Sequence, residues 1–169
     1  MTPLGAVIKG LVAGAAGTLA MDTLLYLRYR RGGGTDSFPS WEFSAGVTTW
    51  DDAPAPAQVG RRLFEGLFQR RLDDRHARLV NNITHWGYGM TAGAGYGLLA
   101  GSLRRPRVAY GPGFGAAVWA AGYAVLPQAG LYKPIYEYDR TTLAKDLSAH
   151  LVYGTTTAAT FAAVLHRGR

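Results

Sequence analysis

Long stretches without charge are the main pattern along this chain. Residues 79–103, 108–132 and 147–166 contain no Asp, Glu, Lys or Arg, and residues 10–27 contain only Asp22. A helix of about 20 residues crosses the hydrocarbon core of a bilayer, whereas an amphipathic helix of a soluble protein needs a charged face. The pattern therefore predicts four transmembrane helices, at about residues 4–27, 80–102, 110–131 and 144–166.

Small and aromatic residues fill these windows in place of Leu and Ile. The chain holds 23 Gly and no Cys among its 169 residues, and small residues let membrane helices approach closely. We therefore expect an all-α fold, an integral membrane four-helix bundle that forms one membrane domain over residues 1–169. The alternatives are a water-soluble bundle and, for the first window, a signal peptide, which the apolar residues beyond Asp22 disfavour.

The first connection, residues 28–78, has the composition of a soluble segment. After Pro56, apolar side chains recur every four residues at Val59, Leu63 and Leu67. The other faces of this stretch carry Arg61, Arg62, Arg70 and Arg71. This pattern predicts an interfacial amphipathic helix within an extramembrane loop. The alternative is a small soluble cap whose apolar stripe packs on the bundle.

The second and fourth predicted spans share one arrangement of polar and small residues. The matching pairs, all 65 positions apart, are Asn81 and Asp146, His85 and His150, Tyr88 and Tyr153, and Gly89 and Gly154. Each of these spans follows a Gly/Ala-rich one, so the sequence predicts two tandem helix hairpins. Copies with two spans each have the same topology, which places their pseudo-twofold axis along the membrane normal.

Small residues at every fourth position give both spans a smooth face, because residues four apart share one side of a helix. The positions are Gly89, Gly93, Gly97 and Gly101 in the second span, and Gly154 and Ala158 in the fourth. We expect these faces to meet each other, or to pack on the Gly-rich first and third spans.

Polar residues within membrane spans are costly and are functional candidates by default. The candidate intramembrane polar site consists of Asp22, Asn81, His85, Tyr88, Asp146, His150 and Tyr153. The structural alternative is that the histidines only lock helices together. A proton or small-solute path through Asp22, His85 and His150 is a further alternative, because His titrates near neutral pH.

Cofactor and enzyme chemistry find little support in the sequence. Paired histidines could hold haem, but the glycine stripe draws backbones together where a porphyrin needs them apart. Among the possible metal ligands, Asp146 and His150 alone have tight spacing. No P-loop, zinc-protease or serine-hydrolase motif is present. We therefore expect no enzyme, no catalytic residue, no cofactor and no metal.

The net charge is +7. Because the arginines flank spans or balance acids, we expect them to bind anionic lipid headgroups and expect no nucleic-acid partner. Orientation stays open under the positive-inside rule. The short second loop (Arg104, Arg105, Arg107) and the tail (Arg167, Arg169) favour termini inside. The opposite is favoured by Arg28, Arg30 and Arg31, which follow the first span, together with the arginines from Arg70 to Arg78 before the second.

Several short segments carry a resemblance to known proteins: Thr84-His85, Ala94-Gly95-Tyr96, Lys133 to Asp139, Asp146 and His150-Leu-Val. In these the chain resembles the YagU-like family of small bacterial inner-membrane proteins. Its start, Gly14 to Asp22, is similar to uncharacterised actinobacterial multi-pass membrane proteins. The resemblance implies a bacterial plasma-membrane protein with termini inside, in a family linked to acid tolerance without a defined biochemistry. It does not cover residues 31–78.

The function expected from these observations is that of a non-enzymatic multi-pass membrane protein. It would be a structural or accessory component of a membrane assembly, or would self-associate through its Gly-rich helix faces. Its partners would be membrane lipids and other membrane subunits or copies of itself. The alternative is a small transport or proton-handling protein that uses Asp22, His85 and His150.

Overall fold

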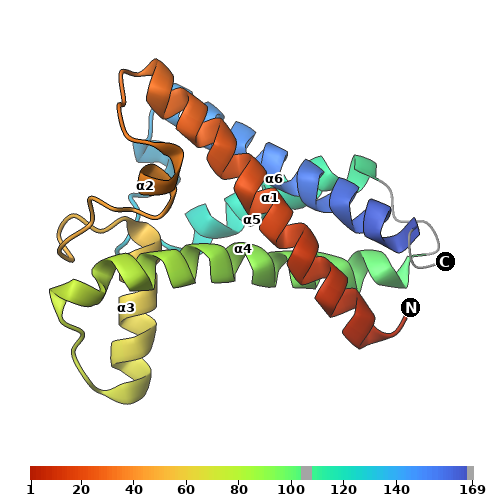
Figure 1. Cartoon of the computed structure of the whole chain (residues 1–169), viewed down its shortest axis with the longest axis horizontal. Coiled ribbons are helices and arrows are strands. Elements are labelled where there is room, and N and C mark those ends of the chain that lie inside the picture. The colour runs from red at the N-terminus through yellow and green to blue at the C-terminus, as the bar shows by residue number, and fades with distance from the viewer. Residues whose placement is uncertain (104–107, 167–169) are drawn as a thin grey trace. The chain divides into compact units, whose positions relative to one another are not determined.

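The computed structural model describes residues 1–103 and 108–166, and these are helical with no strand among them (Figure 1). The α-helices are α1 (Pro3–Arg31), α2 (Phe38–Glu42), α3 (Ala55–Phe68), α4 (Ala77–Ser102), α5 (Gly111–Val125) and α6 (Arg140–His166). Short 3₁₀ turns are η1 (Asp74–His76), η2 (Val108–Tyr110) and η3 (Ile135–Glu137). The expected all-α class is confirmed.

Helices occupy all four windows in which spans are predicted, and α3 occupies the stretch predicted to be amphipathic. The third window is wrong in its extent, because α5 ends at Val125 instead of near residue 131. Pro127 follows closely, and a proline both lacks an N–H donor and restricts the residue before it. Within the described residues, α1 is the one helix that is both long and apolar enough to cross a membrane. The arginines of the second loop and the tail lie outside those residues.

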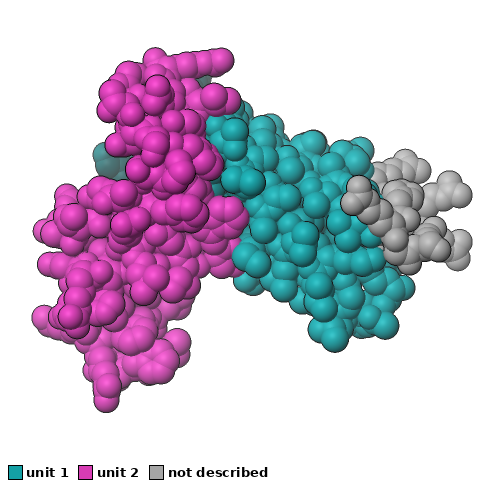
Figure 2. Space-filling view, in the orientation of Figure 1, with its two compact units in different colours: residues 1–25, 89–169 teal, residues 26–88 magenta. Residues whose placement is uncertain are grey.

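The chain divides into two compact units, which Figure 2 colours separately. Unit 1 comprises residues 1–25 and 89–169, and unit 2 comprises residues 26–88. Both boundaries fall inside long helices, α1 and α4.

Glycines in unit 1 bring α4 directly against α1. A Cβ atom added at Gly93 would lie 2.5 Å from both the carbonyl oxygen of Gly10 and the Cα of Gly14. Real Cβ atoms do not tolerate such distances, so only glycine fits this crossing. Gly89 and Gly97 also face α1, at the Thr18 side chain and the Ala6 carbonyl oxygen, and an added Cβ at Gly101 would lie 3.2 Å from the Cβ of Ala6.

A second glycine crossing in unit 1 joins α6 to α5. A Cβ atom added at Gly111 would lie 2.6 Å from the Cα of Thr155, 2.7 Å from the carbonyl oxygen of Gly154 and 3.0 Å from the Cβ of Ala158. The smooth faces of the second and fourth predicted spans thus pack on the first and third. Of the two arrangements expected from the sequence, this one is confirmed.

The interior of unit 1 combines small residues with aromatic ones, and branched aliphatic side chains lie outside it. The buried cluster is Ala13, Tyr96, Ala100, Ala158 and Phe161, with Phe114 packed against it. Large apolar residues lie on the surface instead: Leu4, Ile8, Val12, Leu19, Leu98, Leu99 and Val125. Leu, Ile and Val are among the residues most often buried in water-soluble cores, but none of them is buried in the part of unit 1 that the structure describes.

Unit 2 has its own core around Trp50, which is 4% exposed and packs with Ala57 and Ala77. The Trp50 indole donates to the carbonyl oxygen of Leu72 at 3.0 Å. The Arg61 guanidinium lies 4.9 Å from the centre of the Trp50 ring. These contacts fix one side of α3 within the unit.

The apolar stripe of α3 points away from this core. Leu63 is 60% exposed, Leu67 76% and Phe68 62%. Within unit 2 the buried side of α3 is instead the one that carries Ala57 and Gly60. The predicted alternative, a cap whose apolar stripe packs on the bundle, stays a prediction.

Candidate functional site

Side chains of α4 hold the segment that follows α2 in unit 2. Arg78 and Asn82 both donate to the carbonyl oxygen of Phe43, at 2.9 Å and 3.1 Å. The Asn81 amide donates to the Ser44 hydroxyl at 2.8 Å. Because Phe43 and Ser44 directly follow Glu42, these three bonds fix the backbone beside Glu42 against the first two turns of α4.

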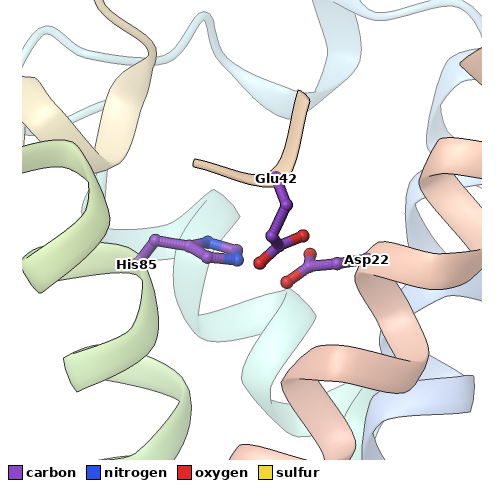
Figure 3. Close-up of side chains that lie close together, drawn as sticks. All are labelled: Asp22, Glu42 and His85. Atoms are coloured by element: carbon purple, nitrogen blue, oxygen red, sulfur yellow. The ribbon is translucent and has the colours of Figure 1, made fainter. Parts of the chain in front are cut away.

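Glu42 and His85 lie close together in unit 2, where Glu42 is buried and His85 is partly buried. Glu42 is 7% exposed, and a carboxylate oxygen of Glu42 and a ring nitrogen of His85 lie within 4.8 Å of each other. Figure 3 shows the Glu42 side chain on the α2 segment and His85 on α4. The sequence predicted His85 as a candidate site residue but did not predict Glu42. The structure alone shows that this acid lies beside the histidine.

Asn81 belongs to the same region, because it lies one helical turn before His85 on α4 and therefore on the same helix face. It is 6% exposed. Its Nδ2 is used by Ser44, but its Oδ1 is buried and has no hydrogen-bond partner within the part of the chain that the structure describes. A buried carbonyl oxygen without a partner costs free energy, so this atom needs an explanation.

The second acid–histidine pair lies in unit 1, on α6. The His150 Nδ1 atom is 3.4 Å from Oδ1 of Asp146 and 3.0 Å from its backbone carbonyl oxygen. The Tyr123 hydroxyl, from α5, also hydrogen-bonds the Asp146 carboxylate. The two residues predicted as a tight pair from their spacing are therefore brought together, and a tyrosine that the sequence did not single out joins them.

Two of the predicted polar residues occupy very different places although their positions match. Tyr153 is 2% exposed and its hydroxyl donates to the carbonyl oxygen of Gly89 at 2.7 Å, which ties α6 to α4 within unit 1. Tyr88 is 55% exposed. The structure therefore does not bury Tyr88 within unit 2.

Asp22 is the one acid in the first predicted span, and it is 2% exposed within α1 of unit 1. One turn earlier, the Thr18 hydroxyl donates a hydrogen bond to the carbonyl oxygen of Gly14 at 3.0 Å. Asp22 thus extends a line of buried small and polar residues along α1. Its burial agrees with the prediction that this acid lies inside the protein.

Outside the long helices, acids serve to close turns. The Leu72 backbone N–H and the Arg61 guanidinium, at 3.0 Å and 3.1 Å from Oε1 of Glu65, hold the pKa of Glu65 below its ordinary value. Likewise, the hydroxyl and backbone N–H of Thr142 lower the pKa of Asp139 at the start of α6. These two acids have structural roles.

Comparison with known proteins finds no matching family model, no matching curated protein and no matching solved structure. Function is therefore argued from the chain itself.

Proposed function

We propose that the protein is a non-enzymatic multi-pass membrane protein of the bacterial plasma membrane, with α1, α4, α5 and α6 as its spans and a structural or accessory role in a membrane assembly. The observation that carries the proposal is the sorting of side chains between interior and surface. Ile8 is 53% exposed, Leu99 72% and Val125 60%. Apart from Asp22, the buried residues of unit 1 are Gly, Ala, Thr and aromatic residues such as Phe161, with no Leu, Ile or Val among those that the structure describes. Lipid tails solvate large apolar side chains, and small residues let spans pack closely.

A tandem duplication of helix hairpins fits the same proposal. Beyond the pairs in α4 and α6, a second constant offset relates Gly14 to Gly111, Tyr26 to Tyr123, Trp41 to Tyr138 and Glu42 to Asp139. Contacts within each unit follow this correspondence, since the Tyr26 and Trp41 rings are 5.6 Å apart and the Tyr123 and Tyr138 rings 5.3 Å. Residues 43–74, which include α3, have no counterpart in the second copy.

The partner-binding surfaces follow from which faces are already used. The faces at Gly93 and Gly154 pack on α1 and α5 of the same chain, so an accessory role would use the outward apolar faces. Lipids and other membrane subunits are the partners of suitable chemistry, because both accept Leu, Ile and Val side chains without polar groups.

The absence of cysteine makes a direct test simple. Single cysteines replace Ile8, Leu99 or Val125, and a control cysteine replaces Tyr136, which is 82% exposed in η3. The variants are reconstituted in liposomes and freeze–thawed with a charged maleimide, so that the reagent reaches both membrane faces. We expect rapid labelling at position 136 and slow labelling at the other three. Equally fast labelling at all four positions would show a water-soluble bundle and refute the proposal.

A second candidate function, proton or small-solute handling, is favoured by the Asp146–His150 pair with its Tyr123 partner. A titratable pair between spans can exchange protons when its environment changes. Proteoliposomes with a trapped pH dye test this function. Faster relaxation of an imposed pH gradient than in empty liposomes, lost in His150→Gln and kept in Tyr136→Phe, would support it. If the pH gradient relaxes at the same rate as in empty liposomes, the proton-handling function is refuted.

A further inference from the structure

We propose that unit 2 holds one divalent first-row transition-metal ion, with the Glu42 carboxylate, the His85 imidazole and the Asn81 side-chain oxygen as its protein ligands. This inference goes beyond the membrane proposal and does not depend on it, because all three residues lie inside one compact unit. It also revises the expectation from sequence that no metal is bound. That expectation considered histidines and acids of the spans and did not include Glu42.

The distance between the two main ligands suits one ion. Zn²⁺ lies about 2.0–2.2 Å from nitrogen and oxygen ligands, so ligands on opposite sides of such an ion stand up to about 4.4 Å apart. The Glu42 oxygen and the His85 nitrogen lie within 4.8 Å. The two side chains point toward each other (Figure 3), so small side-chain rotations would bring both atoms into range.

The buried Asn81 oxygen is the independent observation. Its amide nitrogen is engaged with Ser44, which fixes the orientation of the amide, and its Oδ1 has no hydrogen-bond partner among the described residues. Metal ions accept such carbonyl oxygens as ligands. A metal ion bound by His85, on the same helix face, would give the Asn81 Oδ1 atom a ligand bond. Without an ion, this buried oxygen lacks a hydrogen bond to any residue that the structure describes, which costs free energy.

The surrounding structure is preorganised for binding. Arg78 and Asn82 clamp the carbonyl oxygen of Phe43, so the backbone next to Glu42 is held before any ion arrives. One carboxylate, one imidazole and one amide oxygen form a mixed nitrogen and oxygen set, which suits Zn²⁺ or Mn²⁺ better than the all-oxygen preference of Mg²⁺. Water would complete the coordination.

The test uses the full chain in mild detergent, purified without a histidine tag and stripped with a chelator. Zn²⁺ is titrated by calorimetry, with Mg²⁺ as the contrasting ion. We expect one equivalent of Zn²⁺ to bind more tightly than Mg²⁺, with affinity reduced about tenfold or more in Glu42→Gln and His85→Gln. His150→Gln is the matched control, because it removes a histidine of unit 1, and it should bind Zn²⁺ as the wild type does.

Asn81→Asp keeps the proposal testable if the ligand-removing variants do not fold. It supplies a charged oxygen at the same position and should tighten Zn²⁺ binding. Co²⁺ loaded into the wild-type protein should give visible absorption bands that Zn²⁺ abolishes. Absence of Zn²⁺ binding in the wild type, or equal binding in wild type, Glu42→Gln and His85→Gln, would overturn the proposal. Weaker binding in Asn81→Asp than in the wild type would also overturn it.

Discussion

The rings of Tyr96 and Phe161 pack edge to face in the core of unit 1, with centroids 5.8 Å apart and an interplanar angle of 86°. These two residues are separated by the same 65 positions as the matched pairs of α4 and α6. Two positions that correspond in a twofold-related duplication can touch each other only near the axis that relates the copies. The contact is therefore consistent with the proposed duplication, in which α4 and α6 would be the helices next to that axis.

Two buried tyrosines of unit 1 should respond differently to loss of their hydroxyl groups. The Tyr153 hydroxyl donates to the carbonyl oxygen of Gly89, so Tyr153→Phe removes a buried hydrogen bond between α6 and α4 and should cost about 1 kcal/mol. The Tyr96 hydroxyl is buried without a hydrogen-bond partner in the described part of the chain. Tyr96→Phe should therefore leave the melting temperature unchanged or raise it. Equal losses in both variants, measured by thermal unfolding in detergent, would contradict this assignment.

The glycine crossing between α1 and α4 should be intolerant of a single methyl group. Gly93→Ala places its Cβ against the backbone of α1, and overpacking of this kind costs about 1–3 kcal/mol. Gly95→Ala is the matched control on the same helix, because nothing lies within 4 Å of an added Cβ there. Alanine favours helix over glycine by about 0.5–1 kcal/mol, so this control should be neutral or stabilising. A melting temperature of Gly93→Ala at or above that of the control would refute the crossing.

Asp139 should stabilise α6 in a pH-dependent way. Its carboxylate accepts bonds from the Thr142 backbone N–H and hydroxyl, at 2.9 Å and 2.6 Å, so its pKa is lower in the folded chain than its ordinary value of 3.8. The stabilisation is thus complete well above pH 3.8 and is lost as the pH falls through the lowered pKa.

Melting curves measured across this range check the sign. Asp139→Ala should melt below the wild type at neutral pH, and the difference should shrink toward zero in strong acid. Glu137→Ala, which removes another exposed acid of the same segment, serves as the control. A difference that stays constant down to strong acid would show that the Asp139 carboxylate is not the source of the stabilisation.

Local patterns explain how much of the fold was predictable. Glycine at every fourth position of α4 sufficed to predict a smooth packing face, because a helix period fixes which residues share a side. The spacing of Asp146 and His150 likewise predicted their contact. The end of α5 at Val125 was missed because the uncharged window continues beyond it, and charge alone does not register the effect of Pro127.

Glu42 could not be found from local pattern alone. Its position depends on bonds that α4 makes to Phe43 and Ser44, and these residues lie more than thirty positions before their partners. One signal was present in the sequence, since Phe38-Pro-Ser-Trp-Glu42 has the order of apolar, aromatic and acidic residues found in Ile135-Tyr-Glu-Tyr-Asp139. A similarity between such short segments is good evidence of duplication only when their contacts also correspond. Here they do, because Tyr26 packs on Trp41 as Tyr123 packs on Tyr138.

The exposed stripe of α3 should lie in the interface of the membrane. Leu67 is 76% exposed, and an apolar side chain flanked by arginines suits the boundary between headgroups and acyl chains. Single cysteines replace Leu67 or, as the control on the opposite face of α3, Arg62, and each carries a nitroxide label. Continuous-wave spin resonance in liposomes then reports whether each label lies in the membrane or in water. We expect the label at 67 to collide more with oxygen and that at 62 more with a water-soluble nickel chelate. If both labels favour the chelate, α3 stands in water and its apolar stripe must serve a protein partner instead.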